Sequence, residues 1–415
     1  MRIAIVGGGI SGMVSAYLLC RNHEIVVYEA EDYIGGHTHT VDVELEGATY
    51  PVDTGFIVFN EKTYPHFVKL MRRLDVAWKP SNMSFSVRCG KTGLEYCPTS
   101  LNSMFAQRRN LFRPAFHRMM LDIFRFRKES MALIQSEDDE TTLGRYLEAR
   151  NYSRWFRDYF IIPMGSAVWS ADPARFHDFQ ARAFAAFFHN HGFLNVRDKP
   201  QWLVIQGGSR RYVDKLTRPF LDRIRLSSPV ESISRHDSHV EVKSRDGEIE
   251  RFDQCVLAAH SDQALAMLSD PTDAEREILG ALPYQKNRTV LHTDASMMPS
   301  RRSCWASWNS FLPKEARRGV TLTYNMNMLQ GIRAPVDFCV TLNREQAIDP
   351  GRIIRTMDYE HPVYSTRGFA AQKRFHEISG QNRTHFCGAY WGSGFHEDGV
   401  RSALAVCDSF GEGLS

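Results

Sequence analysis

Residues 1–29 read MRIAIVGGGISGMVSAYLLCRNHEIVVYE, and this stretch decides the class of fold. The β-branched run Arg2–Val6 predicts a short strand, residues 11–21 predict a helix, and residues 24–29 predict a second strand. Joined by a glycine-rich turn, these elements form a βαβ unit with two parallel strands. We therefore expect an α/β protein that begins with a Rossmann-like, dinucleotide-binding domain.

The turn after the first strand fits the pattern G-x-G-x-x-G. Gly7 allows the tight turn, Gly9 lets the backbone approach a pyrophosphate, and Gly12 lets helix and strand pack closely. The pyrophosphate is then expected at the helix N-terminus, beside Ile10 and Ser11, where free N–H groups favour negative charge. On its own the pattern would indicate only an ordinary glycine turn.

Glu29 supports the dinucleotide interpretation because it ends the second predicted strand, twenty-two residues after Gly7. A carboxylate at this position is expected to accept hydrogen bonds from ribose hydroxyls, and it disfavours a 2′-phosphate.

Composition narrows the remaining classes of function. The chain has 415 residues, a net charge of +3 and 43% hydrophobic residues, so no overall positive field indicates a nucleic-acid partner. The eight cysteines form no Cys-x-x-Cys pair and have no histidine at metal-ligand spacing, which favours reduced thiols and predicts no metal site. No apolar run reaches eighteen residues, so we expect a cytoplasmic protein that does not span a membrane.

Changes in the hydrophobic pattern along the chain predict two domains whose segments alternate in the sequence. Helical periodicity dominates between residues 60 and 200, strand-like runs return from residue 226, and the chain ends in a strand, a glycine-rich loop and a helix. Residues 1–60, 200–262 and 380–415 are expected to form a discontinuous cofactor domain. Residues 61–199 and 263–379 are expected to form an inserted α+β substrate domain.

Two further motifs carry a family resemblance. Gly35-Gly36-His37 follows Glu29 closely, and residues 51–55 read PVDTG. With these motifs the sequence resembles the flavin-containing amine oxidase and phytoene desaturase superfamily. The resemblance implies an FAD cofactor, with His37 at the diphosphate in place of the family's arginine and Thr40 supplying part of that contact. It places Asp53 and Gly55 near the flavin ring, although Asp53 also fits a turn-capping role.

The resemblance extends to later segments. Residues 228–233 resemble the strand in which Val230 holds the adenine, and residues 253–259 resemble a strand that ends at the cofactor at Ala259. Residues 386–400 resemble the segment that closes over the flavin, and the N-terminus of its helix suits a reduced, anionic flavin. Further FAD contacts are therefore expected at Gly388, Asp398, Gly399 and Val400. No cysteine lies in residues 388–394, so we expect the FAD to be bound non-covalently.

A narrower likeness is to bacterial FAD proteins encoded beside cyclopropane-fatty-acid-synthase-type methyltransferases. It rests on residues 394–399 (GFHEDG), 305–309 (WASWN), 323–327 (TYNMN) and the pair His191-Gly192. This likeness implies desaturation of a methyl-branched unsaturated fatty acyl chain, with a lipid methyltransferase as a partner. An amine oxidase and a non-catalytic flavoprotein partner of such a methyltransferase are the alternatives.

Candidate catalytic residues lie at the start of the last predicted helix. His396, Glu397 and Asp398 are the expected bases, although Glu397 and Asp398 also suit capping of a helix that begins at Gly399. An amine oxidase would need a lysine near the flavin, for which Lys286 is the nearest candidate. Aromatic residues expected at the substrate are Trp169, Trp305, Trp308, Tyr324, Tyr390 and Trp391.

Residues 108–128 carry seven basic and one acidic side chain, with another acid at Glu129. Within them, residues 113–128 predict a helix whose apolar stripe comprises Phe116, Met119, Met120, Ile123 and Phe126. We predict peripheral membrane contact through this helix, on the inner face of the cytoplasmic membrane. An amphipathic core helix with a solvated basic face is the alternative.

Overall fold

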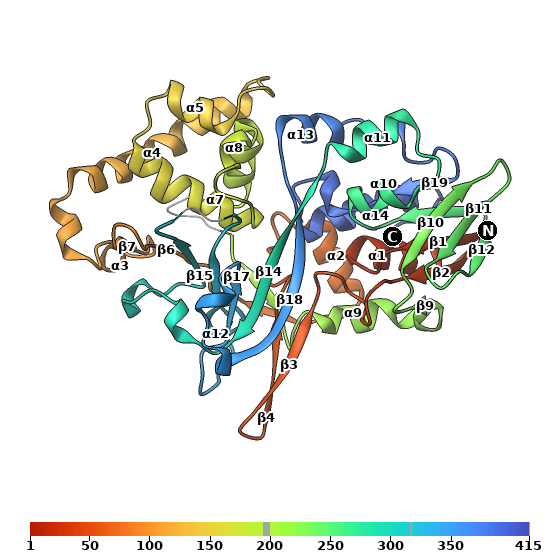
Figure 1. The fold of residues 1–415 in the computed structure, drawn as a ribbon, viewed down its shortest axis with the longest axis horizontal. Helices are drawn as coiled ribbons and strands as arrows, with labels where there is room; N and C mark the ends of the chain where they lie inside the picture. Colours follow the sequence, from red (N-terminus) through yellow and green to blue (C-terminus); the bar gives the residue numbers. More distant parts are fainter. Residues whose placement is uncertain (194–199, 316–317, 415) are drawn as a thin grey trace.

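The computed structural model describes residues 1–193, 200–315 and 318–414. One layer is a five-stranded parallel sheet in the order β19-β13-β1-β2-β9. Its strands are β1 (Arg2–Val6), β2 (Glu24–Tyr28), β9 (Ile224–Arg225), β13 (Gln254–Leu257) and β19 (Thr384–Phe386). Three separate stretches of the chain therefore meet in one sheet, on the right of Figure 1, as the α/β prediction requires.

Helices from both ends of the chain cover this sheet. The predicted first strand and helix are confirmed as β1 and α1, but α1 ends at Leu19 and the last helix begins at His396 rather than Gly399. Sheet and helices enclose one apolar core that includes Ile5, Val14 and Val406. The helices in this part are α1 (Ile10–Leu19), α2 (Pro65–Arg73), α9 (Arg210–Thr217) and α14 (His396–Asp408).

An antiparallel sheet in the order β10-β11-β12 lies at the edge of this layer. Its strands are β10 (Val230–Arg235), β11 (Val240–Ser244) and β12 (Ile249–Phe252). They share a core with α10 (Ser261–Met267), α11 (Asp273–Gly280) and α13 (Thr366–Gln372).

The second layer is a seven-stranded sheet in the order β18-β14-β17-β16-β15-β6-β7. The long strands β14 and β18 pair from Tyr284 opposite Pro362 to His292 opposite Ile353, and they run across the middle of Figure 1. The strands are β6 (Phe85–Cys89), β7 (Glu95–Tyr96), β14 (Tyr284–His292), β15 (Trp308–Leu312), β16 (Leu322–Asn325), β17 (Cys339–Leu342) and β18 (Ile353–Pro362). Beside it are two pairs, β3 (Thr40–Leu45) with β4 (Ala48–Asp53) and β5 (Trp78–Pro80) with β8 (Leu203–Ile205), and the helix α12 (Met326–Gln330).

A helical lobe occupies the left of Figure 1 and corrects the predicted membrane-facing stripe. Phe116, Met119 and Phe126 of α4 are buried in the core of this lobe, and Met120 and Ile123 pack against it. The apolar stripe therefore faces inward, because the lobe's other helices supply the apolar surface that the stripe needs to cover. The lobe comprises α3 (Leu101–Met104), η1 (Arg108–Phe112), α4 (Pro114–Gln135), α5 (Leu143–Ala149), α6 (Arg154–Phe156), α7 (Ile162–Trp169) and α8 (Ala181–Asn190). Among the described residues, no helix combines the length and apolar character needed to cross a membrane.

Candidate active site

A single cavity of about 900 Å³ reaches from the glycine-rich turn after β1 to the helical lobe. At one end its walls are backbone and small residues, including Gly8, Ala30, Ala258 and Gly388. At the other end its walls are large apolar side chains, including Trp169 and Phe187. The cavity therefore has a cofactor-like end and an apolar end.

The turn after β1 meets the steric demands of a bound pyrophosphate. A Cβ atom on Gly9 would have no other atom within 4 Å, so the backbone here faces open cavity. A Cβ on Gly12 would lie 1.9 Å from the carbonyl oxygen of Gly7, which is why helix and strand can pack so closely only with glycine there. Gly7, Gly9, Ile10 and Ser11 line the cavity, as predicted.

Glu29 lines the cavity at the end of β2, where the ribose contact is predicted. One carboxylate oxygen accepts a hydrogen bond from the Gly8 N–H at 2.7 Å, and the other accepts from the Glu31 N–H at 2.9 Å. These bonds fix the carboxylate beside the glycine turn, while burial raises its pKa above the usual range.

The Gly35-Gly36 doublet lies against the glycine turn. A Cβ on Gly36 would come within 3.1 Å of the Gly9 Cα, and its φ of +58° is one that glycine adopts readily. His37 follows and lines the cavity together with His260 and His361. The ring centroid of His37 lies 5.3 Å from that of His361 and 6.2 Å from that of His260.

These histidines do not supply the positive charge that an arginine would supply at this position. Burial lowers the pKa of His37 to about 4 and holds that of His361 well below its usual range. His361 Nδ1 lies 2.9 Å from the amide nitrogen of Asn287, and His260 Nδ1 lies 3.3 Å from a Glu360 oxygen. In the free protein, His37 is therefore a neutral imidazole where the resemblance places a cation.

Thr40 and Asp53 do not line the cavity, so their predicted cofactor contacts are wrong. Thr40 donates its hydroxyl hydrogen to Asp53 Oδ1 at 2.6 Å, and that oxygen also accepts from the N–H and hydroxyl of Ser209. The Gln330 amide donates to Asp53 Oδ2 at 2.9 Å. Burial raises the pKa of Asp53 to about 6. The buried Asp53 carboxylate therefore connects β4 to α9 and α12 through hydrogen bonds.

Gly55, two residues further on, does line the cavity, as predicted. A Cβ there would lie 2.2 Å from the carbonyl oxygen of His37, the atom that accepts a hydrogen bond from the Phe56 N–H at 2.7 Å. The two segments thus lie in direct backbone contact and bring Phe56 into the cavity wall.

The remaining cofactor predictions fall into two groups. Val230, Ala259 and Gly388 line the cavity. Gly399 and Val400 lie behind its wall, where a Cβ on Gly399 would be 2.6 Å from Ile10 and where Val400 is fully buried. The Ser11 hydroxyl donates to the Gly399 carbonyl oxygen at 3.0 Å, so the N-terminal turns of α1 and α14 meet at the cavity. Gly399 and Val400 therefore pack the first turn of α14 against α1.

Glu397 and Asp398 are capping residues, which corrects their prediction as bases. The two oxygens of Glu397 accept hydrogen bonds from the N–H groups of His66 and Phe67, at the start of α2. Asp398 Oδ2 accepts from the N–H groups of Ser393 and Phe395, and its other oxygen pairs with Arg401 at 2.8 Å. Neither residue lines the cavity, and Asp398 is likewise removed from direct cofactor contact.

His396 lines the cavity and belongs to a network that the sequence did not predict. Its Nε2 lies 2.9 Å from the Thr38 hydroxyl and 3.1 Å from the Tyr212 hydroxyl, and these hydroxyls are 2.5 Å apart. Its ring stacks on Phe56 at a centroid distance of 3.5 Å. Burial holds the pKa of His396 well below its usual range, so the ring is neutral in the free protein.

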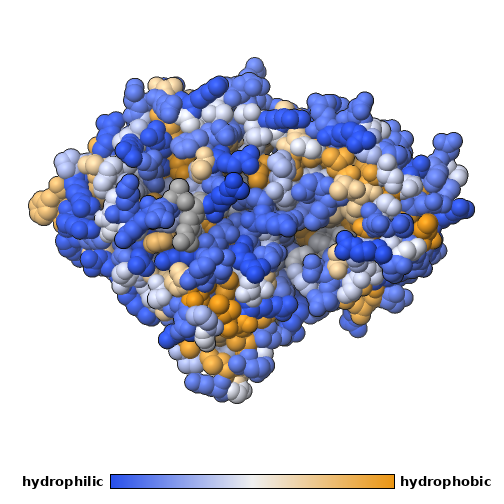
Figure 2. All heavy atoms as spheres, in the orientation of Figure 1, coloured by the Kyte–Doolittle hydropathy of each residue, from blue (hydrophilic) through white to orange (hydrophobic). Residues whose placement is uncertain are grey.

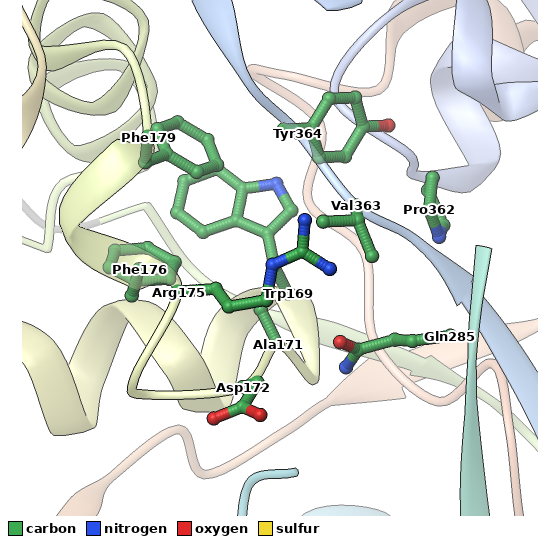
Figure 3. Close-up of a pocket in the computed structure, with 10 residues that line it drawn as sticks. All are labelled: Trp169, Ala171, Asp172, Arg175, Phe176, Phe179, Gln285, Pro362, Val363 and Tyr364. Atoms are coloured by element: carbon green, nitrogen blue, oxygen red, sulfur yellow. The ribbon is translucent and has the colours of Figure 1, made fainter. Parts of the chain in front are cut away.

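Four of the six predicted substrate aromatics line the cavity, namely Trp169, Trp308, Tyr324 and Tyr390. Trp305 and Trp391 do not: Trp305 donates its indole N–H to the Pro299 carbonyl oxygen and lies under Arg302, and Trp391 packs edge-on against Phe375. Figure 3 shows a second, small pocket beside Trp169, lined by Phe176 and Phe179 and by Pro362, Val363 and Tyr364 at and after the end of β18.

The apolar end also contains residues that were not named among the predicted site residues. They come from segments far apart in the chain, and no local motif marks them. These residues are Ile57, Val58, Met83, Val168, Phe187, Phe193 and Trp202.

Lys286 does not occupy the buried position that an amine oxidase lysine would need. Its side chain is 82% exposed and its Nζ lies 3.8 Å from a Glu360 oxygen, at the edge of the cavity. Asn287 and Thr289 of β14 are instead the buried polar residues. Within the described ranges, Lys286 is the one lysine among the residues that line the cavity.

Outside the cavity, His236 and His239, in the turn after β10, form a surface cluster with Glu241 of β11. Each histidine Nε2 lies about 3.4 to 3.5 Å from a Glu241 oxygen. Arg251 also binds this carboxylate at 3.0 Å. We assign the cluster as a network of polar surface contacts around Glu241.

Solved structures of other proteins share the fold of this chain. Cyclohexylamine oxidase from Brevibacterium oxydans shares the fold with a TM-score of 0.70 and 16% identity, over 99% of each chain. A CLA-producing fatty acid isomerase from P. acnes does so with a TM-score of 0.64 and 16% identity, over 99% of this chain and 98% of that one. A tryptophan 2-monooxygenase from Allorhizobium ampelinum is 46% identical over 41 residues, which span 9% of this chain and only 6% of that protein.

The family model for flavin-containing amine oxidoreductases matches residues 10–292, which is more than half of the chain. It begins at the helix whose N-terminus lines the cofactor end of the cavity. FAD is therefore the cofactor, and the glycine turn and Glu29 line the cavity where we expect it to bind. The chain belongs to the flavin-containing amine oxidoreductase family and is an FAD-dependent oxidoreductase.

Proposed function

We propose that this oxidoreductase desaturates an unsaturated fatty acyl chain, in particular a methyl-branched chain of a membrane phospholipid. The observation that carries the proposal is the apolar end of the cavity, whose walls include Val58, Met83, Val168 and Phe187. Such walls suit a hydrocarbon chain, which gains stability by leaving water. A fatty acid isomerase with the same fold supports this choice of substrate class.

The reaction removes two hydrogens from carbons next to, or on either side of, the existing double bond. It forms one new C=C bond, and the product is a diene. One hydrogen leaves with both bonding electrons as a hydride, and the other leaves as a proton. FAD, when bound, supplies the hydride acceptor. An existing double bond lowers the cost of breaking the allylic C–H bond, so the proposed substrate is already unsaturated.

His396 is the proposed proton acceptor, because its imidazole lines the cavity and is held in place by contacts on its Nε2 and on its ring face. The hydroxyls of Thr38 and Tyr212 hold its Nε2, and Phe56 stacks on its ring. These contacts restrict the ring to one orientation, which is what a general base requires.

Oxidation of an amine is the second candidate function. Trp308 and Tyr324 form an edge-on pair with centroids 5.1 Å apart in the cavity wall, and Glu360 lies at its edge. Aromatic faces and a carboxylate attract an alkylammonium group. Against this candidate, Glu360 is already paired with His260 and Lys286.

An anaerobic single-turnover assay separates the candidates. Purified holoenzyme is mixed with phospholipid that carries methyl-branched monounsaturated chains, with the fully saturated lipid as control, and with simple amines and polyamines. We expect bleaching of the oxidised flavin by the unsaturated lipid alone, together with a diene lighter by two hydrogen atoms. Bleaching by amines without bleaching by lipid would establish the second candidate. Bleaching by neither would favour a non-catalytic partner of a lipid methyltransferase.

A further inference from the structure

We propose that the outer tip of the helical lobe binds the surface of an anionic lipid bilayer. The tip consists of η1, the start of α3 and the solvent-facing side of α4. Its apolar residues are Leu101, Leu111, Phe112, Leu121 and Phe124, and its basic residues are Arg108, Arg109, Arg127 and Lys128. This face is opposite to the stripe that the sequence favoured, which is buried in the lobe.

The apolar residues of the tip are unusually exposed. Phe112 is 86% exposed, Leu101 is 77% exposed and Leu121 is 63% exposed. Figure 2 shows hydrophobic atoms at the left end of the molecule, where Figure 1 places the segment between α3 and α4. Several large apolar side chains gathered on one protruding part of a protein mark an interaction surface.

Contacts within the tip hold these side chains on one surface. His117 Nε2 lies 2.8 Å from the Leu111 carbonyl oxygen, which ties η1 to the first turns of α4. The Arg108 guanidinium donates to the Asn102 side-chain oxygen at 2.7 Å, which ties η1 to α3 beside Leu101. Leu121 and Phe124 follow His117 at a spacing of four and seven residues, so all three lie on one face of α4.

The charges around the tip fit an anionic occupant. Asp122 is buried, accepts the Ser153 N–H at 2.9 Å and lies 3.4 Å from Arg118. Glu129 pairs with Arg125 at 2.8 Å. The carboxylates are thus neutralised, whereas the four basic residues of the tip have no carboxylate within ion-pair distance in the described parts of the chain. Outward-facing charge on the tip is therefore positive.

A bilayer fits this combination better than an acidic protein does. Large apolar side chains on one face of a helix, flanked by arginine and lysine, are typical of helices that lie in the membrane interface. The same helix packs inward on α8, where the centroids of Phe126 and Phe184 are 6.1 Å apart, and Phe187 of α8 lines the cavity. The proposed membrane surface and the apolar end of the cavity thus belong to the same helical lobe.

Flotation of the holoenzyme with vesicles tests the proposal without any substrate turnover, so its outcome is independent of the proposed reaction. Vesicles of phosphatidylcholine alone are compared with vesicles that also contain phosphatidylglycerol. We expect binding to the anionic vesicles and little binding to the neutral ones. Phe112→Ser is expected to reduce the partition coefficient roughly tenfold, because one large apolar side chain no longer leaves water for the bilayer. Arg127→Gln with Lys128→Gln is expected to reduce it about fivefold for each charge removed.

Matched controls separate a membrane surface from a general effect. Leu121→Ser should weaken vesicle binding, whereas Leu221→Ser should not, although Leu221 is also 63% exposed and lies in η4 (Arg218–Arg223) outside the tip. Arg276→Gln with Arg367→Gln is the control for charge, because both arginines are exposed and lie outside the tip. Retained FAD in every variant shows that the fold is intact. Absent vesicle binding, equal loss in tip and control variants, or a change only in self-association would each overturn the proposal.

Discussion

The two ends of the cavity are built in different ways. At the cofactor end, the cavity wall is formed by backbone and glycines from short, local motifs. A Cβ on Gly9 would enter open cavity, and Gly36 lies against Gly9. At the apolar end, large side chains such as Met83, Trp169 and Phe187 come from elements distant in sequence. Cofactor recognition is therefore encoded locally, whereas substrate recognition depends on tertiary packing.

The largest effect is expected from Gly9→Val, which places a branched side chain in the space that the pyrophosphate requires. The purified variant should be folded and colourless, with no FAD released on denaturation. Gly413→Val is the control, since a Cβ there also meets nothing within 4 Å but Gly413 does not line the cavity. Full FAD content in Gly9→Val would show that the cofactor end is elsewhere.

At the junction of the two ends, His396→Ala should retain FAD but slow anaerobic flavin reduction by roughly 10²–10⁴, the usual contribution of a general base. Tyr212→Phe removes one partner of His396 Nε2 and leaves Thr38, so it should slow reduction less. Stopped-flow absorbance measures both rates. An unchanged rate in His396→Ala would assign the proton to another acceptor.

In the helical lobe, truncating a phenylalanine should cost much more stability on the buried face of α4 than on the exposed face. Phe126→Ala removes a fully buried ring and is expected to cost about 3–5 kcal/mol of unfolding free energy. Phe124→Ala, on the exposed face, should change it by less than about 0.5 kcal/mol. Denaturant unfolding followed by circular dichroism gives both values. Equal costs would contradict the assignment of the two faces.

A further effect is expected from pH, through His37 beside the glycine turn. Its folded pKa is about 4, below the ordinary 6.5, so the neutral ring contributes stability that is full above pH 6.5 and is lost as the pH falls through about 4. The unfolding midpoint of flavin-free protein should therefore decline over this window. His37→Asn should reduce that decline, whereas His376→Asn, at an exposed position, should not. An identical pH dependence in His37→Asn would contradict the lowered pKa.

The sequence predicted the parts of the site whose chemistry is local. Gly7, Gly9 and Gly12 act through the backbone geometry of one βαβ unit and Glu29 through a carboxylate at its end, and a linear motif describes both. Asp53 and Glu397 were misassigned because a carboxylate that caps distant N–H groups looks the same in sequence as one that contacts a cofactor or a substrate.

Long-range contacts explain the rest. The network of Thr38, Tyr212 and His396 joins residues that are 174 and 184 positions apart, and no spacing rule reveals it. On α4, periodicity identified the stripe around Phe116 and Phe126 but could not show which face packs inward. Leu121 and Phe124 are exposed only because the lobe folds against the opposite face.

A charge placed in the apolar end distinguishes an acyl substrate from an amine most directly. Met83 is partly exposed and lines the cavity, so Met83→Glu can be accommodated without loss of the core, and Met83→Leu is the matched control. Flavin reduction by lipid and by amines is measured anaerobically in both variants. We expect Met83→Glu to reduce the rate with unsaturated lipid by more than tenfold, with Met83→Leu near the unsubstituted rate. Faster reduction by an amine in Met83→Glu, with no lipid-dependent reduction in any form of the enzyme, would contradict the acyl-chain proposal.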